Sequence, residues 1–191
     1  MPTPPAKTPR FFIALLPPKP IWDYAEAVIC ELGDRYNTRT AKAPPHVTLQ
    51  PPFLWAMERV APLEAAIAQV AQEYAAVPVL LRGFGAFAPR VLYLNVLKTP
   101  ELLTLQGDLM LHLQRTLGIV DPTTQRRPFA PHMTVASRNM SSAIFRQAWA
   151  DLQTRDVAFD FVSDRLTLLV HHGHRWEIYA HYPLRSPIAP S

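Results

Sequence analysis

The chain has 191 residues, of which 49% are hydrophobic and 18% are charged. This composition is typical of a compact globular domain and excludes an intrinsically disordered chain. The net charge of +4 favours anionic partners only mildly, and the absence of a lysine or arginine block argues against tight nonspecific binding to long nucleic acids. The single cysteine, Cys30, excludes an internal disulfide and a zinc site built from cysteines.

The N-terminal segment gives an expectation about location. We interpret residues 1–191 as one domain that begins with a flexible proline-rich leader over residues 1–9. The leader lacks the apolar core of a signal peptide, and the apolar run over residues 11–16 is too short to cross a bilayer. These features predict a cytoplasmic protein with no membrane partner.

Prolines, glycines and apolar periodicity divide the chain into alternating strand-like and helical runs. In the first part we expect a strand over 10–16, a helix over 21–32, a strand over 45–49 that ends at Pro51-Pro52, a helix over 58–74, and a hairpin of strands 77–87 and 91–97. The second part predicts a helix capped by Thr99 that ends near Gly118, a strand over 131–135, a helix over 141–152, and strands over 157–161, 165–171 and 176–182.

Two of these predicted strands carry the same short pattern. Pro45-His46-Val47-Thr48-Leu49 and Pro131-His132-Met133-Thr134-Val135 both read proline, histidine, apolar, threonine, apolar, and they lie almost half a chain apart. One His-x-Thr would be weak evidence, whereas two copies that share three neighbours indicate duplication of a supersecondary unit.

The order of elements around the motifs also repeats. Residues 10–98 and 99–185 each give a motif strand, a helix and a hairpin, and the offset relates Val91-Leu-Tyr-Leu to Trp176-Glu-Ile-Tyr. We therefore expect an α+β fold with two pseudo-symmetric lobes of antiparallel or mixed sheet, helices outside, and a central cleft that carries the two motif strands. Since one chain would hold both lobes, a monomer would be sufficient.

The motif suits chemistry on a phosphodiester. Residues i and i+2 of a strand share a face, so His46 and Thr48 would project together while their apolar neighbours enter the core. The same holds for His132 and Thr134. Histidine can serve as acid or base near neutral pH, and threonine hydroxyls can donate hydrogen bonds to non-bridging phosphate oxygens. This chemistry requires neither a metal nor another cofactor.

The paired motifs and their spacing resemble the 2H phosphoesterase superfamily, and especially the bacterial 2′-5′ RNA ligase or RNA 2′,3′-cyclic phosphodiesterase proteins. The resemblance spans residues 10–184, and residues 129–138 are particularly similar to the family's second motif region. It implies His46 as proton donor, His132 as activator of water, Thr48 and Thr134 as phosphate ligands, and RNA ends or small cyclic nucleotides as substrates. The residues alone leave the acid and base roles interchangeable.

The chain also departs from the family pattern. Gln50-Pro51-Pro52 follows the first motif, where the RNA ligase branch often has a Phe-Leu-Gly type segment. A proline pair reshapes the rim of the site, which leaves the branch and its substrate open.

Four further residues near the motifs are candidate substrate contacts. Arg127, next to Arg126, could meet a phosphate, and Arg138 could lie on the rim of the site. Phe53 and Phe129 could stack on a base, although core packing is the competing interpretation for both.

Two other functions remain open at this level. The same cleft could bind RNA without catalysis, although the modest net charge argues against this. Alternatively, the segment His171-His172-Gly173-His174 could hold the metal of a hydrolase. An exposed turn is the simpler interpretation, because the segment falls in a predicted hairpin without an acidic partner motif.

Overall fold

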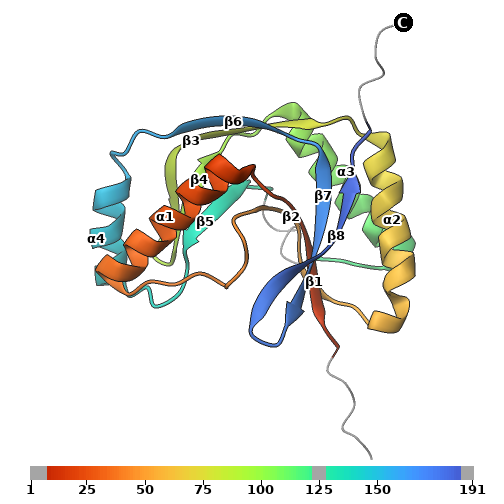
Figure 1. Cartoon of the computed structure of the whole chain (residues 1–191), viewed down its shortest axis with the longest axis horizontal. Helices are drawn as coiled ribbons and strands as arrows, with labels where there is room; N and C mark the ends of the chain where they lie inside the picture. The colour runs from red at the N-terminus through yellow and green to blue at the C-terminus, as the bar shows by residue number, and fades with distance from the viewer. Residues whose placement is uncertain (1–7, 122–127, 186–191) are drawn as a thin grey trace, which may run out of the picture.

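The structure, a computed structural model, describes residues 8–121 and 128–185. Apart from residues 8 and 9, the predicted leader lies outside the described residues. The elements follow one another along the chain as β1 (Arg10–Leu15), α1 (Lys19–Tyr36), β2 (Val47–Leu54), η1 (Met57–Arg59), α2 (Val60–Glu73), β3 (Val77–Phe87), β4 (Val91–Val96), α3 (Pro100–Leu117), β5 (His132–Ala136), α4 (Ser142–Leu152), β6 (Ala158–Ser163), β7 (Arg165–His172) and β8 (Arg175–Pro183) (Figure 1).

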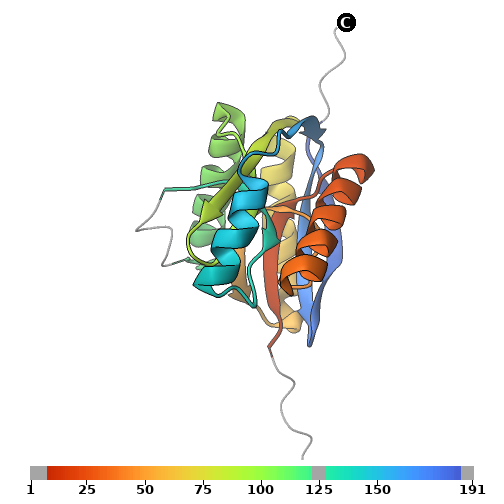
Figure 2. The ribbon, with the colours of Figure 1, turned by 90° about the vertical axis from the view of Figure 1, so that its left-hand side faces the viewer.

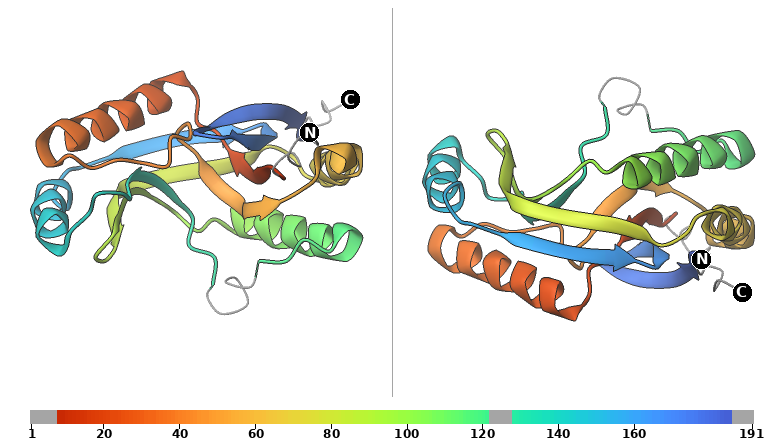
Figure 3. Two further views of the ribbon diagram at one scale, coloured as in Figure 1. Left: turned by 90° about the horizontal axis from the view of Figure 1, so that it is seen from below. Right: turned by 90° about the horizontal axis from the view of Figure 1, so that it is seen from above.

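These strands form two four-stranded sheets, in the orders β2-β1-β7-β8 and β5-β4-β3-β6. Every strand pair in them is antiparallel. Helices α2 and α3 pack beside the first sheet, and α1 packs against β5 with α4 alongside. The two helix pairs lie at opposite ends of the molecule (Figure 3), and α1 and α4 run side by side at one end (Figure 2). The predicted α+β architecture, with two lobes and helices outside, is confirmed.

Neither sheet is built from one of the two predicted chain halves alone. The first sheet combines β1 and β2 with β7 and β8, whereas the second combines β3 and β4 with β5 and β6. Each sheet therefore takes strands from both halves. Element order along the chain cannot reveal this exchange, because antiparallel pairing is decided by long-range contacts.

The two sheets are related by an internal symmetry in which the two motif strands are equivalent. Both β2 and β5 are edge strands, and the two strands contact each other where the sheets meet. Thr48 pairs with Ala14 and Thr134 pairs with Tyr93, and in each pair of strands the register shifts directly beside that threonine. Strand β1 is thus the counterpart of β4. The expected correspondence of Val91–Leu94 with residues 176–179 is wrong, because β4 pairs with a motif strand whereas β8 lies at the far edge of its sheet and pairs with β7.

Local sequence signals set most of the element boundaries correctly. The Thr99 side chain accepts a hydrogen bond from the Leu102 backbone N–H at the start of α3, which ends at Gly118 in the left-handed conformation. Ser141 caps α4 in the same way. These are the residue types that satisfy the free backbone groups of helix ends.

The predicted end of the first motif strand is wrong, and α1 extends beyond the expected 21–32 at both ends. Strand β2 continues through Pro51 and Pro52 to Leu54. An edge strand pairs on one side only, so proline can be accommodated where its missing N–H would not join the ladder. The register between Phe11 and Ile13 also shifts opposite these prolines, which relieves the pairing there.

The core has a large and a small part. One extended apolar cluster includes buried residues of both sheets and all four helices. A second, small cluster of Phe12, Ala14, Leu169 and Trp176 lies on the other face of the first sheet. Among the described residues, no helix is long and apolar enough to cross a membrane.

Candidate active site

The two motifs have the same pattern of burial. Val47 and Leu49 are buried while His46 and Thr48 keep partial exposure. The second motif repeats this, with Met133 and Val135 buried and His132 and Thr134 partly exposed. Alternation along each strand therefore anchors the apolar residues in the core and presents the histidine and threonine on the open side. Within the described chain, neither threonine hydroxyl has an intramolecular hydrogen-bond partner, so both are free to donate to a ligand.

Each imidazole is fixed by the backbone just before it. His46 Nδ1 lies 2.6 Å from the Pro44 carbonyl oxygen, and His132 Nδ1 lies 2.7 Å from the Ala130 carbonyl oxygen. Since a carbonyl can only accept, Nδ1 carries the proton in both residues and donates it. The neutral imidazole then presents the unprotonated Nε2, which can accept a proton from a reactant.

Aromatic rings of the first sheet support His46. Its ring centroid lies 4.7 Å from that of Phe12, and Phe12 packs edge-on against Trp176 at 4.6 Å. These rings belong to the small apolar cluster. His46 thus has an apolar floor that is separate from the main core.

His132 has a different aromatic surrounding. The ring of Phe87 lies 4.9 Å away and that of Tyr93 lies 5.2 Å away. Tyr93 occupies space that Gly85 leaves open, since a Cβ on Gly85 would lie 2.3 Å from the Tyr93 ring. Phe87 retains 39% of its exposed surface, so an aromatic face remains available to a ligand beside this histidine.

The surroundings lower the basicity of both imidazoles. Burial lowers the pKa of His46 to about 4, the hydrogen bond to Pro44 acts in the opposite direction, and the charge of His132 lowers it further. Burial also lowers the pKa of His132, against the effect of its bond to Ala130. Because a charge on His132 is felt at His46, the two rings are electrostatically coupled, and the site disfavours the state in which both are protonated.

The loop before the first motif is attached to both lobes. Arg39 exchanges backbone hydrogen bonds with Arg138, and the Lys42 carbonyl oxygen accepts from the Trp176 backbone N–H at 3.0 Å. The Asn139 side chain donates to the Asn37 carbonyl oxygen at 3.2 Å. These bonds fix the chain immediately ahead of Pro44, whose carbonyl orients His46.

The other predicted contact residues have separate outcomes. Phe53 pairs with Phe11 across the strands and packs with the main core, and Phe129 is also packed against it. Both placements favour the core interpretation over base stacking. Arg138 is exposed, which agrees with a rim position, while Arg127 and Arg126 lie outside the described residues.

The histidine turn does form between β7 and β8, with Gly173 at φ 66°. Across residues 8–121 and 128–185, no three His, Cys, Asp or Glu side chains group together in a way that could hold a metal ion. The cluster that the metal-hydrolase alternative requires is therefore not found there.

Comparison with known proteins places this geometry in a family. Residues 17–175 match the model of the 2′-5′ RNA ligase superfamily. The chain belongs to the 2′-5′ RNA ligase superfamily, the 2H phosphoesterases. A Bacillus cereus protein described as a putative phosphoesterase is 30% identical over 161 residues, which cover 82% of this chain and 86% of that protein.

Solved structures show the same fold. The protein TT0787 of Thermus thermophilus aligns with a TM-score of 0.69 at 18% identity, over 93% of this chain and 98% of that one. LigT of Escherichia coli, solved in complex with NADP+, aligns with a TM-score of 0.60 at 20% identity, over 94% of this chain and 99% of that one.

Several residues around the histidines carry no clear site signal in the sequence. The position of Tyr93 in its hairpin favours core packing, and Phe12, Phe87 and Trp176 lie outside both motifs. Alternation along β1 could have placed Phe12 away from the main core. No local signal indicates that Phe87, at the end of β3, reaches the His132 ring across the hairpin.

Proposed function

We propose that this protein is a metal-independent phosphoesterase that hydrolyses 2′,3′-cyclic phosphate or 2′-5′ linked ends of RNA or nucleotides. The observation that carries the proposal is the matched pair of imidazoles, each with Nδ1 bound to the carbonyl two residues earlier. Superfamily membership supports phosphoester chemistry, and relatives carry the description of phosphoesterase.

In the proposed reaction, one imidazole removes a proton from water while the water oxygen attacks phosphorus. The other imidazole protonates the ribose oxygen as its bond to phosphorus breaks. Thr48 and Thr134 donate hydrogen bonds to the non-bridging oxygens, whose charge is concentrated in the transition state. The resemblance assigns the acid to His46 and the base to His132. Attack on the same cyclic phosphate by the 5′-hydroxyl of a second chain in place of water, with the ribose 3′-oxygen leaving and taking up the proton, would form a 2′-5′ linkage.

The protonation states of the two imidazoles set a condition for this mechanism. With a pKa of about 4 for His46, the ligand-free protein holds this imidazole neutral at pH 7. An anionic phosphate beside the two rings stabilises an imidazolium and raises its pKa. Because protonation of one ring disfavours protonation of the other, the pair would take up one proton, not two, when substrate binds. One imidazole is then protonated and the other neutral, which is the state that acid/base catalysis needs.

Ligands of a structural neighbour support nucleotides as substrates. LigT has been solved in complex with 3′-AMP and with ATP, at TM-scores of 0.59 to this chain. By analogy, RNA ends or small cyclic nucleotides are the partners that we propose here. The single domain over residues 1–191, the monomeric state and the cytoplasmic location stay predictions.

The decisive experiment is incubation of the protein with 2′,3′-cyclic nucleotides and cyclic-phosphate-ended RNA, with phosphorus NMR of the products. We expect hydrolysis to one monophosphate regioisomer, unaffected by a chelator. Loss of activity on chelation with recovery on adding a divalent metal would favour the metal hydrolase. Binding of RNA without any product would favour a noncatalytic RNA-binding module.

A further inference from the structure

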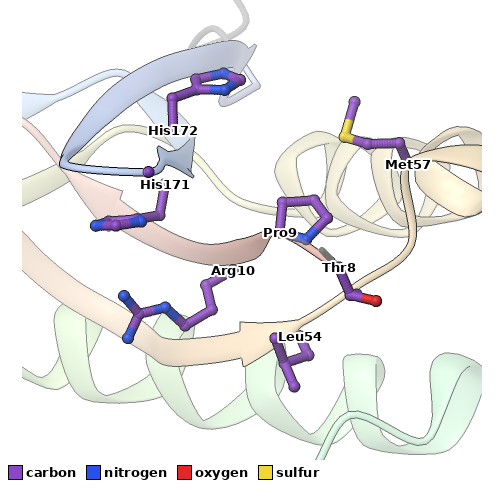
Figure 4. Close-up of a pocket in the computed structure, with 8 residues that line it drawn as sticks. Thr8, Pro9, Arg10, Leu54, Met57, His171 and His172 are labelled. Carbon is purple, nitrogen blue, oxygen red and sulfur yellow. The ribbon is translucent and has the colours of Figure 1, made fainter. Parts of the chain in front are cut away.

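A basic hollow lies at the end of β1 and β2 that is away from Thr48, where Arg10 pairs with Leu54. It has a volume of about 660 Å³ and is lined by Pro9, Arg10, Leu54, Met57, His171 and His172, among others. In Figure 4 the Arg10 guanidinium lies near the His171 ring, the His172 ring points away from both, and the apolar side chains of Leu54 and Met57 lie on the other side of the view. The hollow therefore has the Arg10 guanidinium and two imidazoles on one part and apolar surface on another.

Ring contacts connect this hollow to the first catalytic candidate. His46 touches Phe12, and Phe12 touches Trp176. The Arg10 guanidinium lies over the Trp176 ring at 5.6 Å, and the His171 ring packs against the same indole at 5.0 Å. A group bound between Arg10 and His171 would thus lie on the same face of the sheet as a phosphate held at His46.

Two guanidinium groups supply the positive charge of this region. Within the described part of the chain, Arg10 and Arg138 form no salt bridge, whereas Arg175 is paired with Glu177. Burial lowers the pKa of His171, and the charges of Arg10 and Arg138 lower it further, so both guanidinium groups act on this neutral imidazole. Arg10, which lines the hollow without an acidic partner, is suited to bind phosphate oxygens.

The apolar part supplies the complementary surface. Leu54 and Met57 are large apolar side chains that line the same hollow as Arg10. They are 65% and 41% exposed to solvent. A nucleotide offers the same combination, with an anionic phosphate and the apolar face of a base. A free phosphate ion would use only the basic part.

We propose that this basic hollow holds a nucleotide of the RNA chain that carries the scissile phosphate, with the nucleotide's phosphate at Arg10 and His171, within the electrostatic influence of Arg138, and its base against Leu54 and Met57. This inference rests on the proposed phosphoesterase function and specifies its substrate as an oligonucleotide end. It gives the enzyme a preference for chains over single cyclic nucleotides.

The first test measures binding, independently of turnover. Fluorescence anisotropy gives the Kd of labelled pentauridylate with a 3′-phosphate, and competition gives that of uridine 3′-phosphate, over a range of salt concentrations. Arg10→Gln is expected to weaken oligomer binding about tenfold and to reduce the slope of log K against log salt by about 0.7, the value for one lost single-strand phosphate contact. Arg146→Gln, an exposed arginine on α4, is the matched control and should change neither quantity.

Two further variants guard against a folding defect, because Arg10 also packs on Trp176. His171→Gln and Arg138→Gln should each weaken oligomer binding more than uridine 3′-phosphate binding, with an unchanged Tm. Oligomer binding equal to wild type in all three variants would overturn the hollow as a subsite, even if cyclic mononucleotides are hydrolysed. If the variants lose oligomer binding but the wild type hydrolyses nothing, the subsite stands and the proposed catalysis fails.

Discussion

The two motif strands have one backbone geometry and two different surroundings. In both, the histidine donates from Nδ1 to the carbonyl two residues earlier, and the register shifts beside the threonine. Yet the residue opposite Thr48 is Ala14, whereas the residue opposite Thr134 is Tyr93. The first motif therefore has a small side chain beside its threonine, and the second has an aromatic ring there.

The shared features of the two motifs relate to catalysis, whereas their different neighbours relate to substrate specificity. The duplicated backbone features give each half one oriented imidazole and one free hydroxyl, which is sufficient for a symmetric acid/base site. The unequal side chains beside the two threonines offer a basis for binding an asymmetric substrate in one orientation. We infer that the roles of the two histidines are decided by these neighbours rather than by the motifs themselves.

Removal of either imidazole should have the largest effect. His46→Ala and His132→Ala are each expected to lower kcat by about 10²- to 10⁴-fold, because each would remove one proton-transfer group. Steady-state hydrolysis of a 2′,3′-cyclic nucleotide measures this, and circular dichroism checks that the variants remain folded. Near wild-type activity in either folded variant would contradict the two-histidine mechanism. A substrate with a better leaving group should rescue only the variant that lacks the acid.

Removal of the hydroxyls should have the next largest effect. Thr48→Val and Thr134→Val are expected to reduce kcat by about 10²-fold, the cost of losing one donor to a developing oxyanion. Serine at either position keeps the donor and should retain most of the activity. If serine and valine variants were equally impaired, the side-chain shape rather than the hydrogen bond would matter.

The aromatic wall of the second motif can be changed through its opposing glycine. Gly85→Ala would place a Cβ 2.3 Å from the Tyr93 ring, so the ring must move away from its position near His132. We expect kcat/KM to fall roughly tenfold, since small displacements in a site are costly. Gly107→Ala in α3 is the control, because nothing lies within 4 Å of its added Cβ. It should leave kcat/KM unchanged and stabilise the helix by about 0.5–1 kcal/mol.

The smallest expected effect is on stability as a function of pH. The unfolded chain protonates histidine near pH 6.5, whereas burial lowers the pKa of folded His46 to about 4. The unfolded state therefore binds more protons in this window, and the free energy of unfolding should decrease as the pH falls from about 6.5 to about 4.

His46→Gln should reduce the decrease in the free energy of unfolding at low pH, as measured by Tm between about pH 6.5 and about pH 4. His174→Gln, at an exposed position, controls for the removal of a histidine. An identical pH dependence for wild type and His46→Gln would show that the imidazole is solvated in the folded protein. Phosphate, if it binds between the rings, should reduce the dependence in the wild type.

Much of the fold could be predicted from local patterns. Apolar periodicity located the helices, and Thr99, Gly118 and Ser141 marked helix ends because their side chains or backbone satisfy free groups there. Proline was less informative. Pro51 and Pro52 did not end β2, since the effect of a proline depends on whether its strand lies at an edge, and that is a tertiary property.

The motifs, their alternation on the strands and hence the four side chains that we place at the phosphate follow from the amino-acid sequence alone. These depend on the covalent order of residues and on the two-residue period of a strand, both of which are local. Long-range pairing was needed to make β1 the counterpart of β4, to bring Phe12, Phe87 and Tyr93 around the histidines, and to pack Arg10 and His171 against the same Trp176 ring. Those contacts join residues far apart in the chain, so they depend on which strands pair and in which register.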